Sequence, residues 1–134
     1  MGKERTSTGH HIVVIDDDIT SLDIISFLFE NRGYRVHRCA DGNAAIDYVR
    51  DVKPDLLIVD LMMPQINGVD TIREIRQLGF DTVPIVAFTA VDDPQLHQEA
   101  RDAGCNEVLT KPCSPDRLLK HVKKFLDVPE AVAK

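Results

Sequence analysis

The sequence predicts an α/β protein built on a doubly wound parallel sheet of five strands. Two observations support this class: strand and helix signals alternate along the whole chain, and most of the expected strands are continuous apolar runs. A length of 134 residues suits one domain. We expect a flexible lead-in at residues 1–10, the folded domain at residues 11–127 and a tail at residues 128–134.

Three apolar runs, at residues 12–15, 56–59 and 83–88, predict strands that are buried on both faces of the sheet. A shorter apolar run at residues 108–109 predicts a further strand, and polar residues follow each of the four runs. Residues 34–39 alternate between polar and apolar side chains, which is typical of a half-exposed edge strand. An edge position for this second strand favours the order 2-1-3-4-5 of a flavodoxin-like (βα)5 sheet, with the first and third strands at its centre.

Capping residues indicate where the intervening helices begin and end. Thr20 and Asp23 form a pair that resembles a capping box, and Gly33 is expected to end the first helix. Asp18 is expected to be an exposed residue at the start of that helix, where acidic side chains are favourable. Three later helices are expected to follow N-cap residues, namely Asp41, Asp93 before Pro94, and Ser114 before Pro115.

Composition excludes several classes of protein. The chain is 43% hydrophobic and 28% charged, as globular proteins usually are, and its formal net charge of -6 argues against direct binding to nucleic acid. No apolar run approaches the roughly 18 residues that a membrane span needs. Cys39, Cys105 and Cys113 lack metal-ligand spacing, so we expect free thiols in a reducing, cytoplasmic compartment.

Polar side chains follow the expected strands at one edge of the sheet. Asp16 and Asp17 follow the first strand, Asp60 the third, Thr89 the fourth and Lys111 the fifth. Adjacent strands lie about 4.8 Å apart, so the three carboxylates must crowd together, and a hard divalent cation would relieve their repulsion. A carboxylate beside Mg²⁺, an ammonium and a hydroxyl is suited to attack a phosphoryl group.

Four stretches of the chain carry a resemblance to a known family. VVIDDD, IVDLMMPQINGVD, VAFTA and VLTKP resemble the signature stretches of bacterial response-regulator receiver domains, and the likeness covers about residues 11–127. The resemblance implies a phosphoacceptor domain of two-component signalling, not an enzyme. Its phosphoryl donor would be a histidine kinase or a histidine phosphotransfer protein, and its output partner would bind the face of the fourth helix, fifth strand and fifth helix.

The resemblance also implies a role for each site residue. Asp60 would accept the phosphoryl group, while Asp17 would bind Mg²⁺, or Mn²⁺, directly and Asp16 mainly through water. The remaining implied contacts are the backbone carbonyl of Met62 to the metal, and the side chains of Thr89 and Lys111 to the phosphoryl oxygens. A cis peptide bond is implied between Lys111 and Pro112.

The chain departs from the family pattern at two positions. Receivers commonly carry an aromatic residue where this chain has Val108, and another where it has Cys113. We expect Val108 to pack in the core, since valine often fills strand interiors. The phosphorylation chemistry does not depend on either residue, so these departures bear on how the switch is transmitted.

Other classes of function remain to be weighed. The domain could be an interaction module whose site is not used, which failure to take up phosphate from any donor would favour. An aspartate-nucleophile phosphohydrolase needs a second acid two residues after the nucleophile, where this chain has Met62. A flavodoxin-like cofactor binder needs its phosphate loop after the first strand, whereas residues 6–9 precede that strand.

Overall fold

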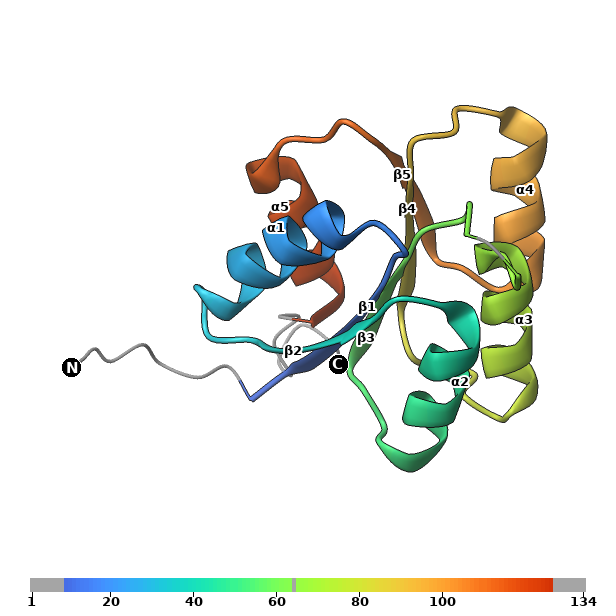
Figure 1. The fold of residues 1–134 in the computed structure, drawn as a ribbon, viewed down its shortest axis with the longest axis horizontal. Coiled ribbons are helices and arrows are strands. Elements are labelled where there is room, and N and C mark those ends of the chain that lie inside the picture. The colour runs from blue at the N-terminus through green and yellow to red at the C-terminus, as the bar shows by residue number, and fades with distance from the viewer. Residues whose placement is uncertain (1–8, 64, 127–134) are drawn as a thin grey trace, which may run out of the picture.

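Five strands and five helices alternate along residues 9–63 and 65–126, the part of the chain that the computed structural model describes (Figure 1). They are β1 (His11–Ile15), α1 (Ile19–Glu30), β2 (Arg35–Cys39), α2 (Gly42–Asp51), β3 (Leu56–Val59), α3 (Gly68–Gln77), β4 (Ile85–Thr89), α4 (Pro94–Ala103), β5 (Glu107–Thr110) and α5 (Pro115–Leu126). The expected tail at residues 128–134, and nearly all of the expected lead-in at residues 1–10, lie outside the described residues.

The strands form one parallel sheet in the order β2-β1-β3-β4-β5, which confirms the predicted fold class. In the register between β1 and β3, Ile15 lies opposite Val59. Between β4 and β5, Thr89 lies opposite Thr110. The residues that directly follow β1, β3 and β5 therefore leave the sheet at one edge, beside the last residue of β4.

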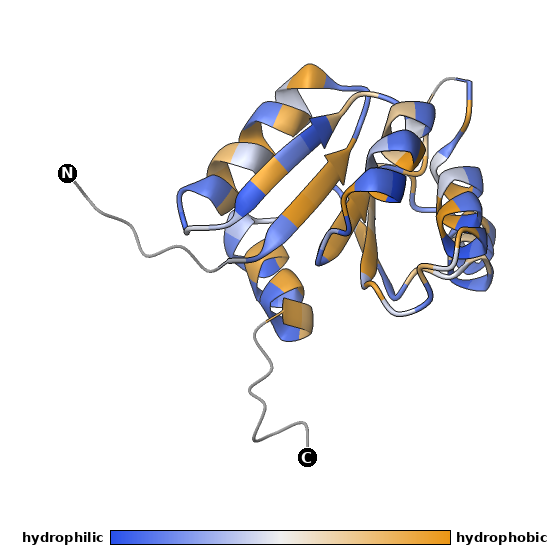
Figure 2. Cartoon of the chain, turned by 90° about the horizontal axis from the view of Figure 1, so that it is seen from below, coloured by the Kyte–Doolittle hydropathy of each residue, from blue (hydrophilic) through white to orange (hydrophobic). Residues whose placement is uncertain are grey.

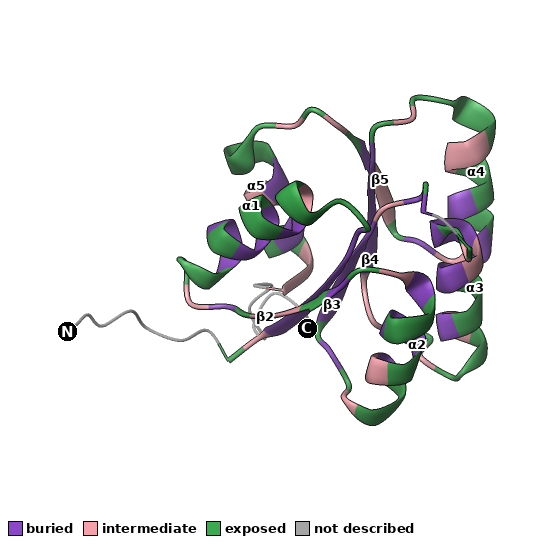
Figure 3. Ribbon diagram, viewed as in Figure 1, coloured by how far each residue is buried: buried purple, intermediate pink, exposed green. Residues whose placement is uncertain are grey.

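Helices cover both faces of the sheet. In Figure 1, α1 and α5 lie on one side of the sheet, and α2, α3 and α4 lie on the other. Alternate side chains of a central strand enter the two cores, so Ile12 and Val14 pack toward α1 and α5, while Val13 and Ile15 pack toward α2, α3 and α4. Figure 3 shows central strands that are buried and helices that are buried on their inner sides only, and the hydropathy in Figure 2 follows the same division.

The edge strand β2 differs from the central strands in its burial. Of its five residues only Cys39 is buried. His37 is half covered, because its ring stacks on that of Tyr48 in α2 with the ring centroids 3.5 Å apart. The predicted half-exposed edge strand is therefore confirmed.

The predicted ends of the first helix are wrong, whereas the other three capping predictions are confirmed. The helix begins at Ile19, so Thr20 lies inside its first turn, and Asp18 is the exposed N-cap residue. The Asp18 carboxylate accepts from the Ser21 hydroxyl at 2.9 Å instead of capping a backbone N–H. The helix ends at Glu30, and Gly33, with φ of 93°, lies in the turn beyond it. In each confirmed cap a side-chain oxygen accepts from a backbone N–H. Asp41 accepts from Ala44 at 2.8 Å, Asp93 from Gln95 at 3.0 Å, and Ser114 from Arg117 at 3.1 Å.

The three cysteines are free thiols, as predicted. Cys39 and Cys105 are buried in the core and Cys113 is half-buried. Within the described residues, no helix has both the length and the apolar character needed to cross a membrane.

Candidate functional site

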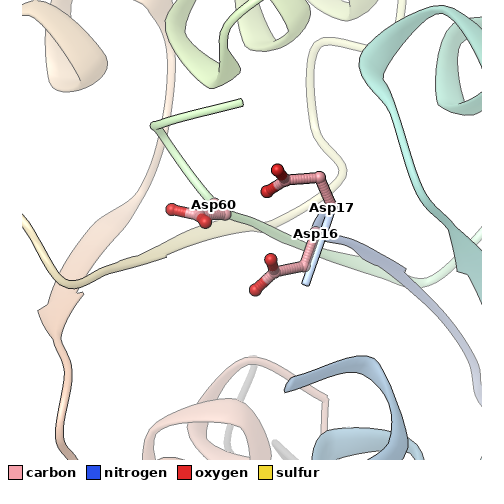
Figure 4. A group of neighbouring side chains, drawn as sticks. All are labelled: Asp16, Asp17 and Asp60. Atoms are coloured by element: carbon pink, nitrogen blue, oxygen red, sulfur yellow. The ribbon is translucent and has the colours of Figure 1, made fainter. Parts of the chain in front are cut away.

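Three carboxylates meet at the carboxyl edge of the sheet. Asp16 and Asp17 directly follow β1, and Asp60 directly follows β3. One oxygen of each lies within 4.8 Å of the others, because the register places the ends of β1 and β3 side by side (Figure 4). Asp16 is buried, Asp60 is half-buried and Asp17 is exposed. The structure therefore brings together the three predicted acids.

Lys111 supplies positive charge to this cluster from the residue after β5. Its Nζ lies 2.8 Å from Asp16 Oδ2 and 3.9 Å from Asp60 Oδ2. The Ser21 hydroxyl on α1 is 3.4 Å from Nζ, and the ring centroid of Phe88 is 5.3 Å from it. The Lys111–Pro112 peptide bond is cis, as the resemblance implied.

Thr89 and Met62 both stabilise the ionised Asp60 carboxylate. The hydroxyl of Thr89, which is buried at the end of β4, is one of these influences. The backbone N–H of Met62 donates to Asp60 Oδ1 at 3.2 Å. The Met62 side chain is 54% exposed. A metal contact through the Met62 carbonyl stays a prediction.

Two opposing influences set the charge of Asp60. Burial raises the pKa of this carboxyl above its ordinary value, and the neighbouring Asp16 raises it further. The Met62 N–H, the Lys111 ammonium and the Thr89 hydroxyl all lower the pKa, because they stabilise the ionised form. A further positive charge at the cluster would favour the carboxylate that phosphoryl transfer needs.

The donor set of the cluster fits Mg²⁺. All of its ligand atoms are carboxylate oxygens, which hard divalent cations prefer over nitrogen or sulfur. The oxygen atoms lie within 4.8 Å of one another, so one hydrated cation would meet all three acids, either directly or through its bound waters. The acidic triad is therefore suited to hold one Mg²⁺ ion.

The structure adds neighbours that the sequence did not reveal. Ser21 reaches Lys111 from α1, and the imidazole of His97 on α4 contacts the carbonyl of Val91 in the loop after β4 at 2.7 Å. Neither residue follows a strand, so strand-end position could not identify them. Ser21 follows Asp18 by three residues, about one helical turn, but this spacing matches no motif that would link it to Lys111.

The two departures from the family pattern pack as ordinary apolar residues. Val108 is half-buried and packs against the core beneath α2, α3 and α4, as predicted. Cys113 packs against the core beneath α1 and α5. An aliphatic side chain at residue 108 has no polar group with which to follow a change at Thr89.

Fold and site together define a class of protein: a doubly wound α/β domain whose strand-end acids, lysine and threonine suit a phosphoryl group and a metal ion. Residues 12–123 match the response regulator receiver domain family. The chain belongs to that family. It is therefore a phosphoacceptor signalling module of two-component systems and not a catalytic enzyme, and membership implies a cognate histidine kinase.

Individual relatives agree with this assignment. The response regulator MprA of Mycolicibacterium vanbaalenii is 32% identical over 115 residues, which are 86% of this chain and 49% of the relative. MprA of Mycobacterium avium is 33% identical over 115 residues, again 86% of this chain and 50% of the relative. This chain thus spans about half the length of these relatives.

Solved structures show the same fold. The chemotaxis protein CheY4 of Vibrio cholerae superposes with a TM-score of 0.83 at 27% identity, over 87% of this chain and 98% of that one. The Francisella response regulator 1452 receiver domain gives a TM-score of 0.82 at 26% identity, over 89% of this chain and 98% of its own. The match covers nearly the whole of each of those receiver structures.

Proposed function

We propose that Asp60 is the residue that accepts the phosphoryl group. The observation that carries this proposal is its set of neighbours: Asp60 receives a hydrogen bond from the Met62 N–H, the Thr89 hydroxyl stabilises its ionised form, and Lys111 lies 3.9 Å away. Asp16 is instead occupied, since Lys111 and the Asp18 N–H both bind it, at 2.8 and 2.9 Å. Asp60 is thus the acid placed among groups that can hold phosphoryl oxygens.

In the proposed reaction, a carboxylate oxygen of Asp60 forms a bond to phosphorus while the bond between phosphorus and the donor nitrogen breaks. The electron pair of the broken bond remains on the donor imidazole. Lys111 and Thr89 bind the phosphoryl oxygens and hold the group in line for transfer. Asp16, Asp17, Asp60 and the Met62 carbonyl would hold Mg²⁺ or Mn²⁺, whose charge offsets that of the acids and the phosphoryl group when it is bound.

Burial supports different modes of metal contact for the two acids after β1. Asp17 is exposed, so its carboxylate is accessible as a direct ligand. Asp16 is 2% exposed and already holds Lys111, which favours contact through water. Asp17→Ala should therefore weaken metal binding more than Asp16→Ala.

The donor would be the phosphohistidine of a histidine kinase or a histidine phosphotransfer protein, and α1 offers a surface for it. Ile24 and Phe27 on this helix are 59% and 69% exposed. Beside them is a hollow of about 190 Å³, mostly apolar, whose lining includes Ile24, Pro112 and the site residue Lys111. A protein seated there would be next to Asp60, so this surface fits the phosphoryl donor better than a distant partner.

We propose that the output partner binds the face formed by α4, β5 and α5.

We also propose that the domain acts in the cytoplasm without binding nucleic acid or membrane itself. Three free thiols support a reducing compartment, and a net charge of -6 disfavours contact with polyanions.

Phosphorylation by a small-molecule donor tests the central proposal. With acetyl phosphate and Mg²⁺, the chain should gain the mass of one phosphoryl group, and a chelator should prevent this. Asp60→Asn, which keeps the shape but is a poor nucleophile, should gain none. Asp18→Asn is the matched control, because Asp18 is an exposed neighbouring acid outside the cluster, and it should be labelled fully. Full labelling of Asp60→Asn would refute the assignment, and no labelling of the unaltered chain would favour an interaction module with an unused site.

A further inference from the structure

Hydrogen bonds lead from Thr89, whose hydroxyl stabilises the ionised acceptor Asp60, to helix α4. The same hydroxyl accepts from the Val91 N–H at 3.2 Å. The carbonyl of the same residue, Val91, is 2.7 Å from Nε2 of His97. Because a carbonyl can only accept, Nε2 must carry the proton. The Val91 backbone therefore joins Thr89 to a side chain of α4.

The backbone of Thr89 is held in the sheet, whereas its hydroxyl can turn about the Cα–Cβ bond. The Thr89 carbonyl accepts from the Lys111 N–H at 2.7 Å, and Thr89 is paired with Thr110 of β5. A phosphoryl group on Asp60 would bring strong acceptor oxygens to the Thr89 hydroxyl. Turning toward them removes the oxygen to which the Val91 N–H now donates. The Val91 backbone, and with it the bond to His97, must then adjust.

The side chain of Val108 on β5 is aliphatic and packs against the core, so it cannot hydrogen-bond to Thr89 or to the loop after β4. His97, by contrast, lies in α4, four residues after the N-cap residue Asp93, whose carboxylate binds the Gln95 N–H. The imidazole thus connects the loop after β4 to the first turns of a helix.

We propose that His97 is a positioning residue that couples Thr89, through the Val91 backbone, to α4, and that it carries the phosphorylation signal to this helix. The proposal rests on the function proposed above. It assigns His97 to transmission of the signal and not to the chemistry at Asp60. Removal of the imidazole donor should leave phosphorylation of Asp60 intact and weaken the response of α4.

Two substitutions of His97 separate hydrogen bonding from packing. His97→Gln keeps a donor, because the amide nitrogen is the same number of bonds from Cα as Nε2 of histidine. His97→Leu keeps bulk without a donor. Amide chemical shifts of the ¹⁵N-enriched chain are measured before and after phosphorylation with acetyl phosphate and Mg²⁺. The extent of phosphorylation is followed by mass.

We expect equal labelling of all three proteins and similar shift changes in α4 for the unaltered chain and His97→Gln. In His97→Leu the changes in α4 should be smaller by about threefold or more, in line with coupling by residues between two sites, while those around Asp60 persist. A full α4 response in His97→Leu, or an equal loss in His97→Gln, would overturn the proposal. Should His97→Leu not fold, the ring ¹⁵N signals of His97 in the unaltered chain decide: a shift on phosphorylation supports the coupling, and none overturns it. Absence of labelling in the unaltered chain would instead refute the acceptor assignment.

Discussion

Met62 and Val91 are apolar at the two positions that, by the resemblance to receiver domains, are expected to flank the route of water to the acceptor. Met62 follows Asp60 by two residues, and Val91 follows Thr89 by two. Neither side chain can hydrogen-bond to a water molecule and orient it for in-line attack, and orientation is a large part of phosphoryl-transfer catalysis. We therefore expect phosphorylated Asp60 to hydrolyse slowly for a receiver.

Polar replacements test this expectation on lifetime. The double variant Met62→Asn and Val91→Glu should lose its phosphoryl group about tenfold faster than the unaltered chain. Decay is followed by mass after acetyl phosphate has been removed. If the unaltered chain decays as fast as the double variant, the two apolar residues serve packing alone and do not set the lifetime.

The buried cysteines should resist alkylation in the folded protein. Burial raises the pKa of Cys39 and of Cys105 to about 11 in each case, with Asp41 adding to the effect at Cys39, so near pH 8 almost no reactive thiolate forms. Cys113 is half-buried and accessible. Iodoacetamide should thus add one label at about pH 8, measured by mass. Cys113→Ser should take none until urea unfolds it, and prompt labelling of folded Cys113→Ser would contradict the expectation.

At the scale of elements, α1 should contribute to recognition of a protein donor without contributing to chemistry. Phe27 is 69% exposed and is not among the side chains that contact Asp60. Phe27→Ser should slow phosphotransfer from the histidine kinase that reacts fastest in a panel by about tenfold, as loss of an aromatic anchor does. Labelling by acetyl phosphate should be unchanged.

Leu78 provides the matched control for the α1 substitution. It is also an exposed hydrophobic residue, at 40%, but it lies at the end of α3, in a hollow lined by residues that precede β3 and β4. Leu78→Ser should leave transfer from both donors unchanged. An equal loss with Leu78→Ser, or no loss with Phe27→Ser, would show that α1 is not the docking surface.

The positions of the elements could be predicted where the signal lies in the local sequence. They could not be predicted where they depend on how elements pack together. Apolar runs and parallel connectivity were enough to place Asp60 and Lys111 at one edge of the sheet. The start of α1 was wrong, because Thr20 offered a plausible cap while the chain turned earlier at Asp18. The contact between His97 and the Val91 carbonyl depends on how α4 packs against its loop, which no spacing in the sequence encodes.

At the scale of the whole molecule, the site draws on widely separated parts of the chain. Asp16, Asp60, Thr89 and Lys111 come from four different strands or strand ends, and Lys111 is 95 residues from the acid that it binds. No single strand–helix unit contains both the acceptor and its lysine. The geometry therefore exists only when β1, β3, β4 and β5 are paired.

Phosphate uptake should for this reason report on the cooperativity of folding. As urea rises, the capacity to be labelled by acetyl phosphate should disappear along the same curve as helical circular dichroism, since small domains usually unfold in one transition. Earlier loss of labelling would reveal a partly opened state in which the helices persist but the strand ends have separated.

Because the site is spread over several strands, a fragment lacking β5 would retain the acceptor without its lysine. Proteolytic removal of the segment after β4 would therefore act as an irreversible off-signal.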